Sequence, residues 1–249
     1  MLSEEILKKL EIFNDPKFIF DEPSHKYTYE DKEFISVTTF IQKFHKPFEK
    51  EKWSKYKADQ RGITVEEILK EWQDLNDYAN IVGSELHNWI EDYFNKKWRS
   101  IPTNLDIIDR INKFNIIYAN QLSKLTPLIF EKRVFSKKWM IAGMIDSIFL
   151  YNGKIFILDW KTNKEFLTDE DHKGRYEKLL HPFESFNKNH LNEYSLQICL
   201  YALILEDIGL DIKGGYLVHI GPNTPAKIHK VNDVRETMRK YLDENYAIK

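Results

Sequence analysis

The chain has 249 residues, of which 42% are hydrophobic and 14% aromatic, and its formal net charge at pH 7 is −2. This length suffices for one domain with a sizeable core, and the charge lacks the basic excess common in nucleic-acid-binding proteins. Cys199 is the only cysteine, which excludes a disulfide framework, a cysteine zinc site and a cysteine-ligated iron–sulfur cluster within one chain. No apolar run approaches the roughly 20 residues of a membrane span, and the acidic N-terminus is not a secretory signal. We therefore expect an intracellular, cytoplasmic protein with no membrane partner.

The elements expected along the chain alternate between helices and strands. Residues 25–37 have the pattern of a small hairpin, and Ser36 or Thr38 then caps a helix that ends at Phe44. Thr64 is a good N-cap for the next helix. The pattern then predicts helices over 65–75, 78–97 and 105–122, strands over 128–135, 145–151 and 155–161, a long polar connection with a short helix over 162–193, a helix over 191–208, strands over 215–220 and 227–231, and a last helix over 234–246.

The strongest local signal is a β-hairpin around Asn152 and Gly153. Asn-Gly is the preferred pair for a type I′ turn, because both central residues need a positive φ. Strand-forming residues flank the pair on both sides. If these two residues form the loop, Tyr151 pairs with Lys154, and every other pair follows from that register.

That register predicts a cluster of charged side chains on one face of the hairpin. Asp146 would lie directly opposite Asp159, with Cβ atoms roughly 4.5–5.5 Å apart, and Lys161 would share the same face. Facing like charges cost stability unless something neutralises them, and oxygen ligands suit Mg²⁺ or Mn²⁺. A hairpin end with solvated acids is the alternative. The apolar residues Ile155 and Phe156 on opposite faces favour instead a strand buried on both sides.

Two predicted helices carry polar side chains at a spacing of four residues, which puts each pair on one helix face. Gly83 and His87 form one pair, and Gln197 and Tyr201 form the other. A glycine within a helix costs about 1 kcal/mol relative to alanine, so something is expected to pack closely beside it. Taken alone, however, His87 is explained more simply as a satisfied histidine at the edge of a core, and the second pair as a rim position in which Tyr201 is an amphipathic core residue.

The order of four short motifs is more specific than any one of them. These are Gly83-x-x-x-His87, Gly143-x-x-Asp146, Asp159-x-Lys161 and Gln197-x-x-x-Tyr201. Over residues 26–231 the sequence resembles the RecB-like branch of the PD-(D/E)XK nuclease superfamily, in particular mitochondrial genome maintenance exonuclease-like and phage and bacterial exonucleases. The resemblance implies an α/β fold with a restriction-endonuclease-like core, in which helices flank a mixed central β-sheet. It also implies a single nuclease domain over 1–249, with an N-terminal hairpin and helical part (1–77) and a catalytic core (78–249).

The resemblance implies a metal site that holds Mg²⁺ or Mn²⁺. Its ligands would be His87, Asp146 and Asp159, with the backbone carbonyl of Trp160 as a further ligand. Glu131 matches an acidic position often present before the Gly143 motif. Relatives that carry an iron–sulfur cluster use several cysteines, so this chain would belong to the cluster-free subset.

The resemblance also implies roles in catalysis and binding. Lys161 would be the catalytic lysine and would act together with Asp146 and Asp159. Gln197 and Tyr201 would line the nucleic-acid channel. Outside these motifs, aromatic and basic residues could stack on bases and follow a phosphate backbone. Examples are Trp53, Tyr56, Lys57 and Arg61.

The expected function is therefore that of a metal-dependent DNA nuclease. The resemblance favours an exonuclease that acts on single-stranded DNA or DNA ends, of bacterial or phage origin and with a role in repair or recombination. Two alternatives remain open within the enzymes, a structure-specific endonuclease and an RNA-cleaving relative. An alternative of another class is a nucleic-acid-binding module that has lost catalysis.

Overall fold

A hairpin forms the centre of the structure, a computed structural model that describes residues 2–171 and 177–247. Its strands are β5 (Ile141–Tyr151) and β6 (Lys154–Lys161). Asn152 and Gly153 have φ values of 49° and 73°, as a type I′ turn requires. Tyr151 pairs with Lys154, so the register predicted from the sequence is confirmed.

Within the described residues, eight strands form one mixed sheet. The hydrogen-bonded order is β1-β2-β3-β5-β6-β7-β8, and β4 pairs with β5 beside this path. The pairs β3–β5 and β6–β7 are parallel, and the others are antiparallel. The remaining strands are β1 (Phe18–Asp21), β2 (Lys26–Tyr29), β3 (Lys32–Ser36), β4 (Thr126–Ser136), β7 (Ile212–His219) and β8 (Lys227–Lys230).

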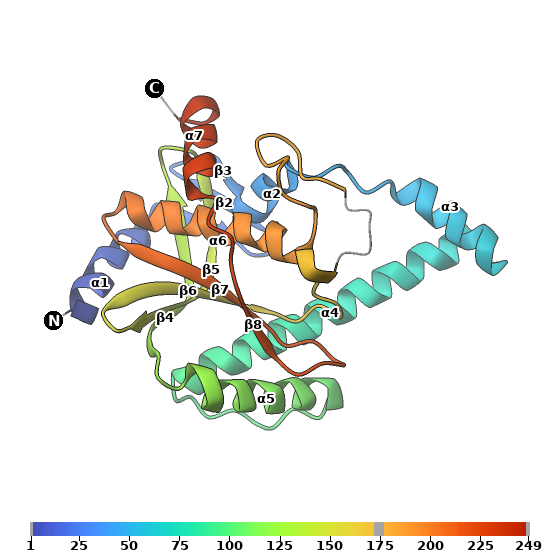
Figure 1. Cartoon of the computed structure of the whole chain (residues 1–249), viewed down its shortest axis with the longest axis horizontal. Coiled ribbons are helices and arrows are strands. Elements are labelled where there is room, and N and C mark those ends of the chain that lie inside the picture. Colours follow the sequence, from blue (N-terminus) through green and yellow to red (C-terminus); the bar gives the residue numbers. More distant parts are fainter. Residues whose placement is uncertain (1, 172–176, 248–249) are drawn as a thin grey trace.

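Helices cover both faces of this sheet (Figure 1). On one face α6 packs with α1, α2 and α7 over the larger core cluster, and on the other face α4 and α5 pack over a second cluster. Because the sheet, α2 and α7 surround α6, that helix is apolar on nearly all sides. The helices are α1 (Leu2–Leu10), α2 (Val37–Gln42), α3 (Lys50–Arg61), α4 (Val65–Phe94), α5 (Leu105–Ile117), α6 (His190–Asp207) and α7 (Arg235–Asn245). The predicted α/β architecture with a mixed central sheet flanked by helices is confirmed at this level.

One long helix replaces two that the sequence pattern suggests. The helices expected over 65–75 and 78–97 are a single helix, α4, that begins in a capping box between Thr64 and Glu67. The polar residues Asn76 and Asp77 between them are weak helix formers, but neither is a glycine or a proline that would break the helix. The predicted boundary between 77 and 78 therefore falls inside one continuous element.

Some other boundaries also differ from the sequence pattern. Ser36 caps α2 through the amide of Thr39, but that helix ends at Gln42 and not at Phe44. The last turn of the helix expected over 105–122 is a π-helix over 118–122. In the connection over 162–193 the described residues include a short 3₁₀ helix, Asp169–Asp171, while residues 172–176 lie outside the described part.

A helical arm projects from the body of the molecule (Figure 1). It consists of α3 and the N-terminal part of α4, approximately residues 50–80, and the two helices run beside each other. Arg61 joins them through ion pairs with Glu71 at 2.6 and 3.0 Å. The rings of Phe48 and Trp72 pack at 5.8 Å near the base of α3.

Candidate metal centre

The centre lies where β5 and β6 diverge. Their ladder ends at the pair Ser147–Leu158, one step before the predicted pair of Asp146 and Asp159. In place of a further ladder bond, the amide of Trp160 donates to Oδ2 of Asp146 at 2.9 Å. The two carboxylates are therefore near each other, but they are not a regular cross-strand pair.

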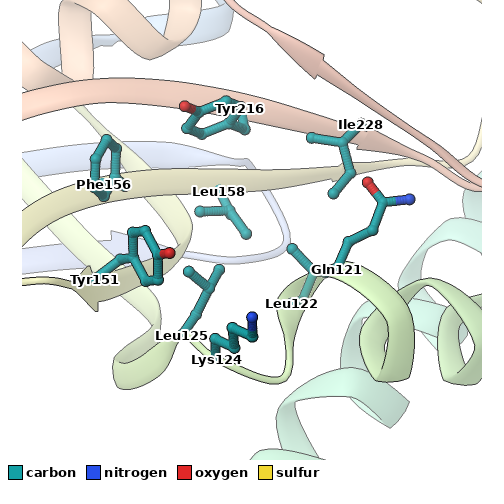
Figure 2. Close-up of a pocket in the computed structure, with 9 residues that line it drawn as sticks. All are labelled: Gln121, Leu122, Lys124, Leu125, Tyr151, Phe156, Leu158, Tyr216 and Ile228. Carbon is teal, nitrogen blue, oxygen red and sulfur yellow. The ribbon is translucent and has the colours of Figure 1, made fainter.

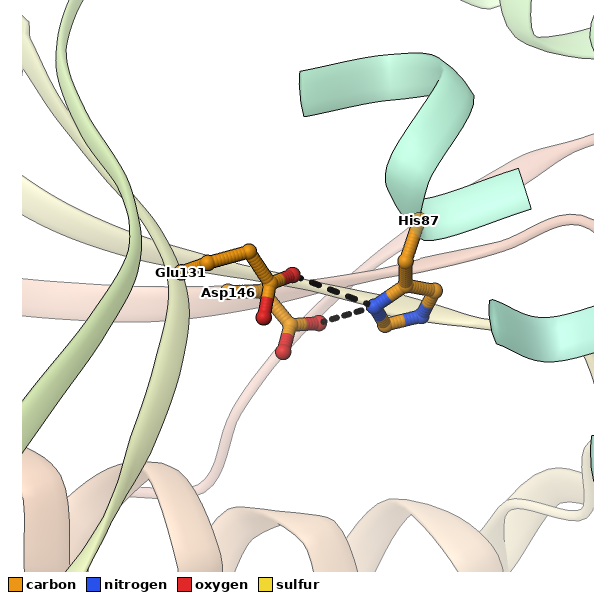
Figure 3. Close-up of side chains that lie close together, drawn as sticks. All are labelled: His87, Glu131 and Asp146. Atoms are coloured by element: carbon orange, nitrogen blue, oxygen red, sulfur yellow. Dashed lines mark ion pairs between the residues drawn. The ribbon is translucent and has the colours of Figure 1, made fainter. Parts of the chain in front are cut away.

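His87 brings α4 to this point of the sheet. Its Nδ1 atom lies 3.6 Å from Oδ2 of Asp146 and 3.7 Å from Oε1 of Glu131 (Figure 3). Donor atoms of these three residues all lie within 4.8 Å of one another, and each side chain is only partly exposed. Among the predicted ligands, the structure thus groups His87 with Asp146. It adds Glu131 and leaves Asp159 outside this group.

The other ring nitrogen of His87 identifies the tautomer of the neutral ring. Nε2 lies 2.9 Å from the carbonyl oxygen of Trp160, and a carbonyl can only accept, so Nε2 carries the hydrogen. The lone pair of a neutral His87 is therefore on Nδ1, which faces the two carboxylates. A histidine ligand held through its second nitrogen by a carbonyl is the usual arrangement in metal sites. The Trp160 carbonyl, predicted as a ligand, is thus the hydrogen-bond acceptor of the imidazole in this structure, and its role as a ligand stays a prediction.

The charges of the group perturb the pKa of His87. Burial lowers this pKa, but the carboxylates of Asp146 and Glu131 outweigh burial and raise it to about 9. Without an ion, a proton thus occupies Nδ1 at neutral pH. The site attracts positive charge strongly, which is the property that a cation site requires.

Glu131 occupies the position on β4 that faces Asp146, because Phe130 pairs with Ser147 and Lys132 pairs with Ile145. Its φ of 47° interrupts the regular strand. A non-glycine residue in this conformation is unfavourable, and such strain is concentrated at functional sites. The sequence match to an acidic position is the only signal that pointed to this residue.

Asp159 lies beneath the group and faces α6. It is 1% exposed, and its Oδ2 atom is 2.7 Å from Nζ of Lys161. That contact is an ion pair without aligned hydrogen-bond geometry, so Oδ2 has no hydrogen-bond partner among the described residues. Burial and the charge of Asp146 raise the pKa of Asp159 to about 6. The ammonium of Lys161 is the positive partner of this buried carboxylate.

Lys161 is held by three groups around its ammonium. Besides the ion pair with Asp159, Nζ donates to Oε1 of Gln197 at 3.3 Å and lies 4.1 Å from the ring centre of Tyr194. Burial lowers the pKa of Lys161, but Asp159 and Asp146 raise it further, so the group is an ammonium. The sequence pattern did not distinguish Tyr194 from Tyr201, the other tyrosine of α6, as the one that contacts Lys161.

Tyr201 packs behind the site rather than on its surface. The side chain is 3% exposed, and a Cβ placed on Gly143 would come within 2.8 Å of its ring. Gly143 is therefore required for close approach of α6 to β5. The phenol is enclosed by the core in this structure, and its role in lining a nucleic-acid channel stays a prediction. A Cβ placed on Gly83 would lie 3.3 Å from Oγ1 of Thr162.

The donor set fits a divalent cation. Ligand bonds of about 2.0–2.2 Å place two ligand atoms at most about 4.4 Å apart, and the contacts of His87 with both carboxylates lie within this limit. Two carboxylates with one imidazole suit Mn²⁺ better than Mg²⁺, because imidazole binds later transition metals more readily. Oδ2 of Asp159, which is paired with the ammonium of Lys161 at 2.7 Å, is a further oxygen beside this set.

A separate cavity of about 330 Å³ lies between the 121–125 turn and the outer face of the sheet (Figure 2). Its walls are mainly apolar, and they contain no carboxylate or imidazole among the described residues. It therefore lacks the groups needed for hydrolysis. The lining residues are Gln121, Leu122, Lys124, Leu125, Tyr151, Phe156, Leu158, Tyr216 and Ile228.

Comparisons with known proteins do not identify the chain. No family model and no curated protein matches it. Among solved structures, one titled "Crystal structure of SSO0001" aligns with 98% of this chain and 84% of that chain, at 16% sequence identity and a TM-score of 0.33. That TM-score is too low to support a conclusion about fold or function. Among the described residues, no helix is both long and apolar enough to cross a membrane.

Proposed function

We propose that the protein is a metal-dependent nuclease that hydrolyses phosphodiester bonds in DNA, on a core of the PD-(D/E)XK type. The observation that carries the proposal is the juxtaposition of an ion-attracting group (His87, Glu131 and Asp146) with the Asp159–Lys161 ion pair. Phosphodiester hydrolysis requires an activated water and a positive charge beside the phosphate oxygens. A bound ion and the ammonium of Lys161 would supply both within one small region of the sheet.

His87, Glu131 and Asp146 would hold the ion, with Asp159 as the adjacent oxygen donor. A bound Mn²⁺ or Mg²⁺ would act as a Lewis acid and lower the pKa of a water molecule. Lys161 is an ammonium and cannot accept a proton, so its role is to stabilise the negative charge that develops on the phosphate. Gln197 and Tyr194 hold the ammonium in place, and Asp159 keeps it charged.

Access for a phosphate backbone is provided beside Glu131. A cavity of about 500 Å³ reaches Glu131, and its wall includes Lys132 and Arg133. The exposed guanidinium of Arg133 supplies positive charge at this entrance, while Lys132 is buried and bonded to Asn14. A net charge of −2 is therefore compatible with DNA, because the cationic groups are local and a bound ion would add to them.

The helical arm supports a nucleic-acid substrate. Trp53 and Tyr56 are 42% and 53% exposed, which leaves their rings available for stacking on bases. Arg61, in contrast, is held by both oxygens of Glu71, so it is not free to follow a phosphate backbone as the sequence suggested. We propose single-stranded DNA or DNA ends as the substrate, since stacking requires bases that are not paired.

The test is incubation of the protein with end-labelled linear and covalently closed circular DNA, single- and double-stranded, with Mn²⁺, with Mg²⁺ and with EDTA. We expect release of short products from linear single strands that depends on the metal, and no cleavage of circles. Nicking of circles would identify an endonuclease, and cleavage of RNA alone would change the substrate class. Binding of DNA without cleavage under every metal condition would favour a module that has lost catalysis.

The matched control is Asp159→Asn, which preserves shape but removes the charge beside Lys161. Cleavage must disappear in this variant if the observed activity belongs to the protein. Equal activity of Asp159→Asn and the wild type would assign the cleavage to a contaminant or to another site.

A further inference from the structure

A third cavity, of about 520 Å³, lies beyond Lys161 on the same face of the sheet as Asp159. One wall is the segment that leaves β6 directly after Lys161, with Lys164 and Phe166. The other wall comes from the ends of β7 and β8, with His219, Lys227 and His229. We call these five residues and the space between them the ring cavity. Its volume is within the roughly 300–1,000 Å³ typical of sites for small ligands.

The ring cavity lies close to Lys161. The ammonium of Lys161 contacts the ring of Tyr194 at 4.1 Å, and that ring lies 6.1 Å from the ring of Phe166. The strand pairing also places the ring cavity near Lys161, because Lys161 pairs with His219 in the β6–β7 ladder. A group bound in the ring cavity would thus be a near neighbour of a phosphate held at Lys161.

Planar rings dominate its walls. Phe166 stacks on His229 at 4.3 Å with an interplanar angle of 23°, and the ring of His219 lies 5.1 Å away. Nε2 of His219 faces the carbonyl of Asn163 at 2.7 Å, which fixes that ring. Burial lowers the pKa of His219, and burial with the charge of Lys227 lowers that of His229 to about 4. At neutral pH both imidazoles are therefore uncharged rings.

The charges at the rim exclude a site for a polyanion. Lys164 and Lys227 are exposed there, but Glu165 and Asp171 also line the cavity and offset their charge. A ligand with a flat, weakly polar surface and one phosphate group fits this balance better than a polyphosphate does. A nucleotide in a single strand has that composition.

We propose that the ring cavity holds the base of one nucleotide adjacent to the phosphodiester bond that is cleaved. This inference rests on the proposed function, because it deepens the substrate contacts of the same site. The base stacks on the face of Phe166 or His229, and Lys164 and Lys227 flank its phosphate. Stacking on an aromatic side chain tolerates every base, so this subsite would select for an unpaired base but not for a sequence.

The test is a scan of a single-stranded, end-labelled oligonucleotide in which one abasic site is moved through the positions near the cleaved bond, with Mn²⁺. We expect one position at which loss of the base lowers kcat/KM by about 5- to 150-fold, as loss of one stacked base predicts. Phe166→Ala and His229→Ala should lower the rate on the intact oligonucleotide and remove the difference between intact and abasic DNA. Phe166→Tyr and His229→Phe keep a ring, and should restore the wild-type profile.

The control variant is Tyr151→Ala, which removes an exposed ring from the cavity of Figure 2 and should leave the abasic profile unchanged. Thermal melting identifies any variant that has unfolded. A wild-type profile without a sensitive position would overturn the ring cavity as a base site, while metal-dependent cleavage would still support the nuclease. An identical profile for Phe166→Ala and the wild type would overturn it equally.

A binding measurement separates this inference from catalysis. In EDTA, where no cleavage occurs, 2-aminopurine at the sensitive position should lose fluorescence on binding the wild type, because stacking quenches it. Phe166→Ala should reduce that quenching, whereas Tyr151→Ala should not. If the protein cleaves no DNA, the proposed function fails. If no 2-aminopurine position shows quenching on binding, the base site is contradicted as well.

Discussion

The backbone amide of Trp160 donates a hydrogen bond to Oδ2 of Asp146, at 2.9 Å. The carbonyl of the same residue lies 2.9 Å from Nε2 of His87. One residue of β6 therefore orients a carboxylate from β5 and an imidazole from α4. Both contacts use backbone atoms of Trp160. These atoms therefore stay in place when the side chain of Asp146 or of His87 is substituted.

Asp146→Asn tests the carboxylate. The amide oxygen of asparagine can still accept from Trp160, so the fold should be retained, but one negative charge of the ion site is lost. We expect turnover to fall by at least about 100-fold, and Mn²⁺ to raise the melting temperature of the wild type but not of the variant. Asp211→Asn is the control, since that side chain is 73% exposed and distant in sequence from the motifs. Near-normal turnover of Asp146→Asn would remove this residue from the site.

The pH dependence of stability tests the environment of His87. In the folded, ion-free protein its pKa is about 9, above the ordinary value of 6.5. Its contribution to stability is thus fully present below pH 6.5 and is lost as the pH rises to 9. In EDTA, the free energy of unfolding of the wild type should decrease over this interval relative to that of His87→Asn. Parallel curves for the two proteins would show that the imidazole has no such environment.

The same protonation affects binding of the ion. Below pH 9 an ion must displace the proton from Nδ1 of His87, so the affinity for Mn²⁺ should increase by up to tenfold per pH unit between pH 7 and 9. Isothermal titration in buffers of different ionisation enthalpy should show release of about one proton per ion. Release of no proton would exclude Nδ1 as a ligand.

Lys161→Met tests the ammonium. Methionine keeps the apolar stem of the side chain, but it removes the charge beside Asp159 and the bond to Gln197. We expect kcat to fall by about 100- to 1,000-fold, as for loss of one group that stabilises transition-state charge. The affinity for DNA, measured in EDTA, should change little. If binding and turnover fell equally, Lys161 would be an anchor for phosphate and not a group that acts in the chemical step.

Gly143→Ala tests the packing of α6 on β5. The new Cβ would lie 2.8 Å from the ring of Tyr201, so we expect a loss of about 1–3 kcal/mol in the free energy of unfolding, as for overpacking. Combination with Tyr201→Leu, which removes the ring, should give a smaller loss than the sum of the two single changes. Tyr201→Phe retains the ring and should not relieve the strain. Strict additivity of Gly143→Ala and Tyr201→Leu in chemical denaturation would contradict this contact.

The central hairpin could be predicted from sequence because its register depends on two local residues. Asn152 and Gly153 specify the turn, and pairing then follows along both strands. The register could not reveal that the β5–β6 ladder ends at the pair Ser147–Leu158 and does not include Asp146, since this depends on contacts with β3, α4 and β7. The direct pairing of Asp146 with Asp159 was therefore wrong in detail, although both side chains lie in one region.

Other features of the site depend on distant parts of the chain. His87 meets Asp146 only because α4 crosses the sheet, and the order of motifs anticipated this meeting through resemblance alone. Glu131 and Tyr194 gave no periodic signal, since one lies on a strand with an irregular φ and the other on a helix that is apolar on nearly all sides. Burial of Tyr201 was one of two alternatives that the sequence left open, because a spacing of four specifies a helix face but not what covers it.

Because α4 is continuous, its length fixes the direction in which the arm points relative to the candidate metal centre. The helix runs unbroken from Val65 to Phe94, and its buried residues from Val82 onward anchor it to the sheet. Each residue added before that anchor, for example an alanine after Asp77, would turn the arm by about 100° and advance it by about 1.5 Å without moving His87. Insertion of one residue would swing Trp53 and Tyr56 to another side of the molecule, and insertion of four would bring them back to within about 40°. The length of this helix thus decides in which direction the exposed rings of the arm point relative to His87 and the candidate metal centre.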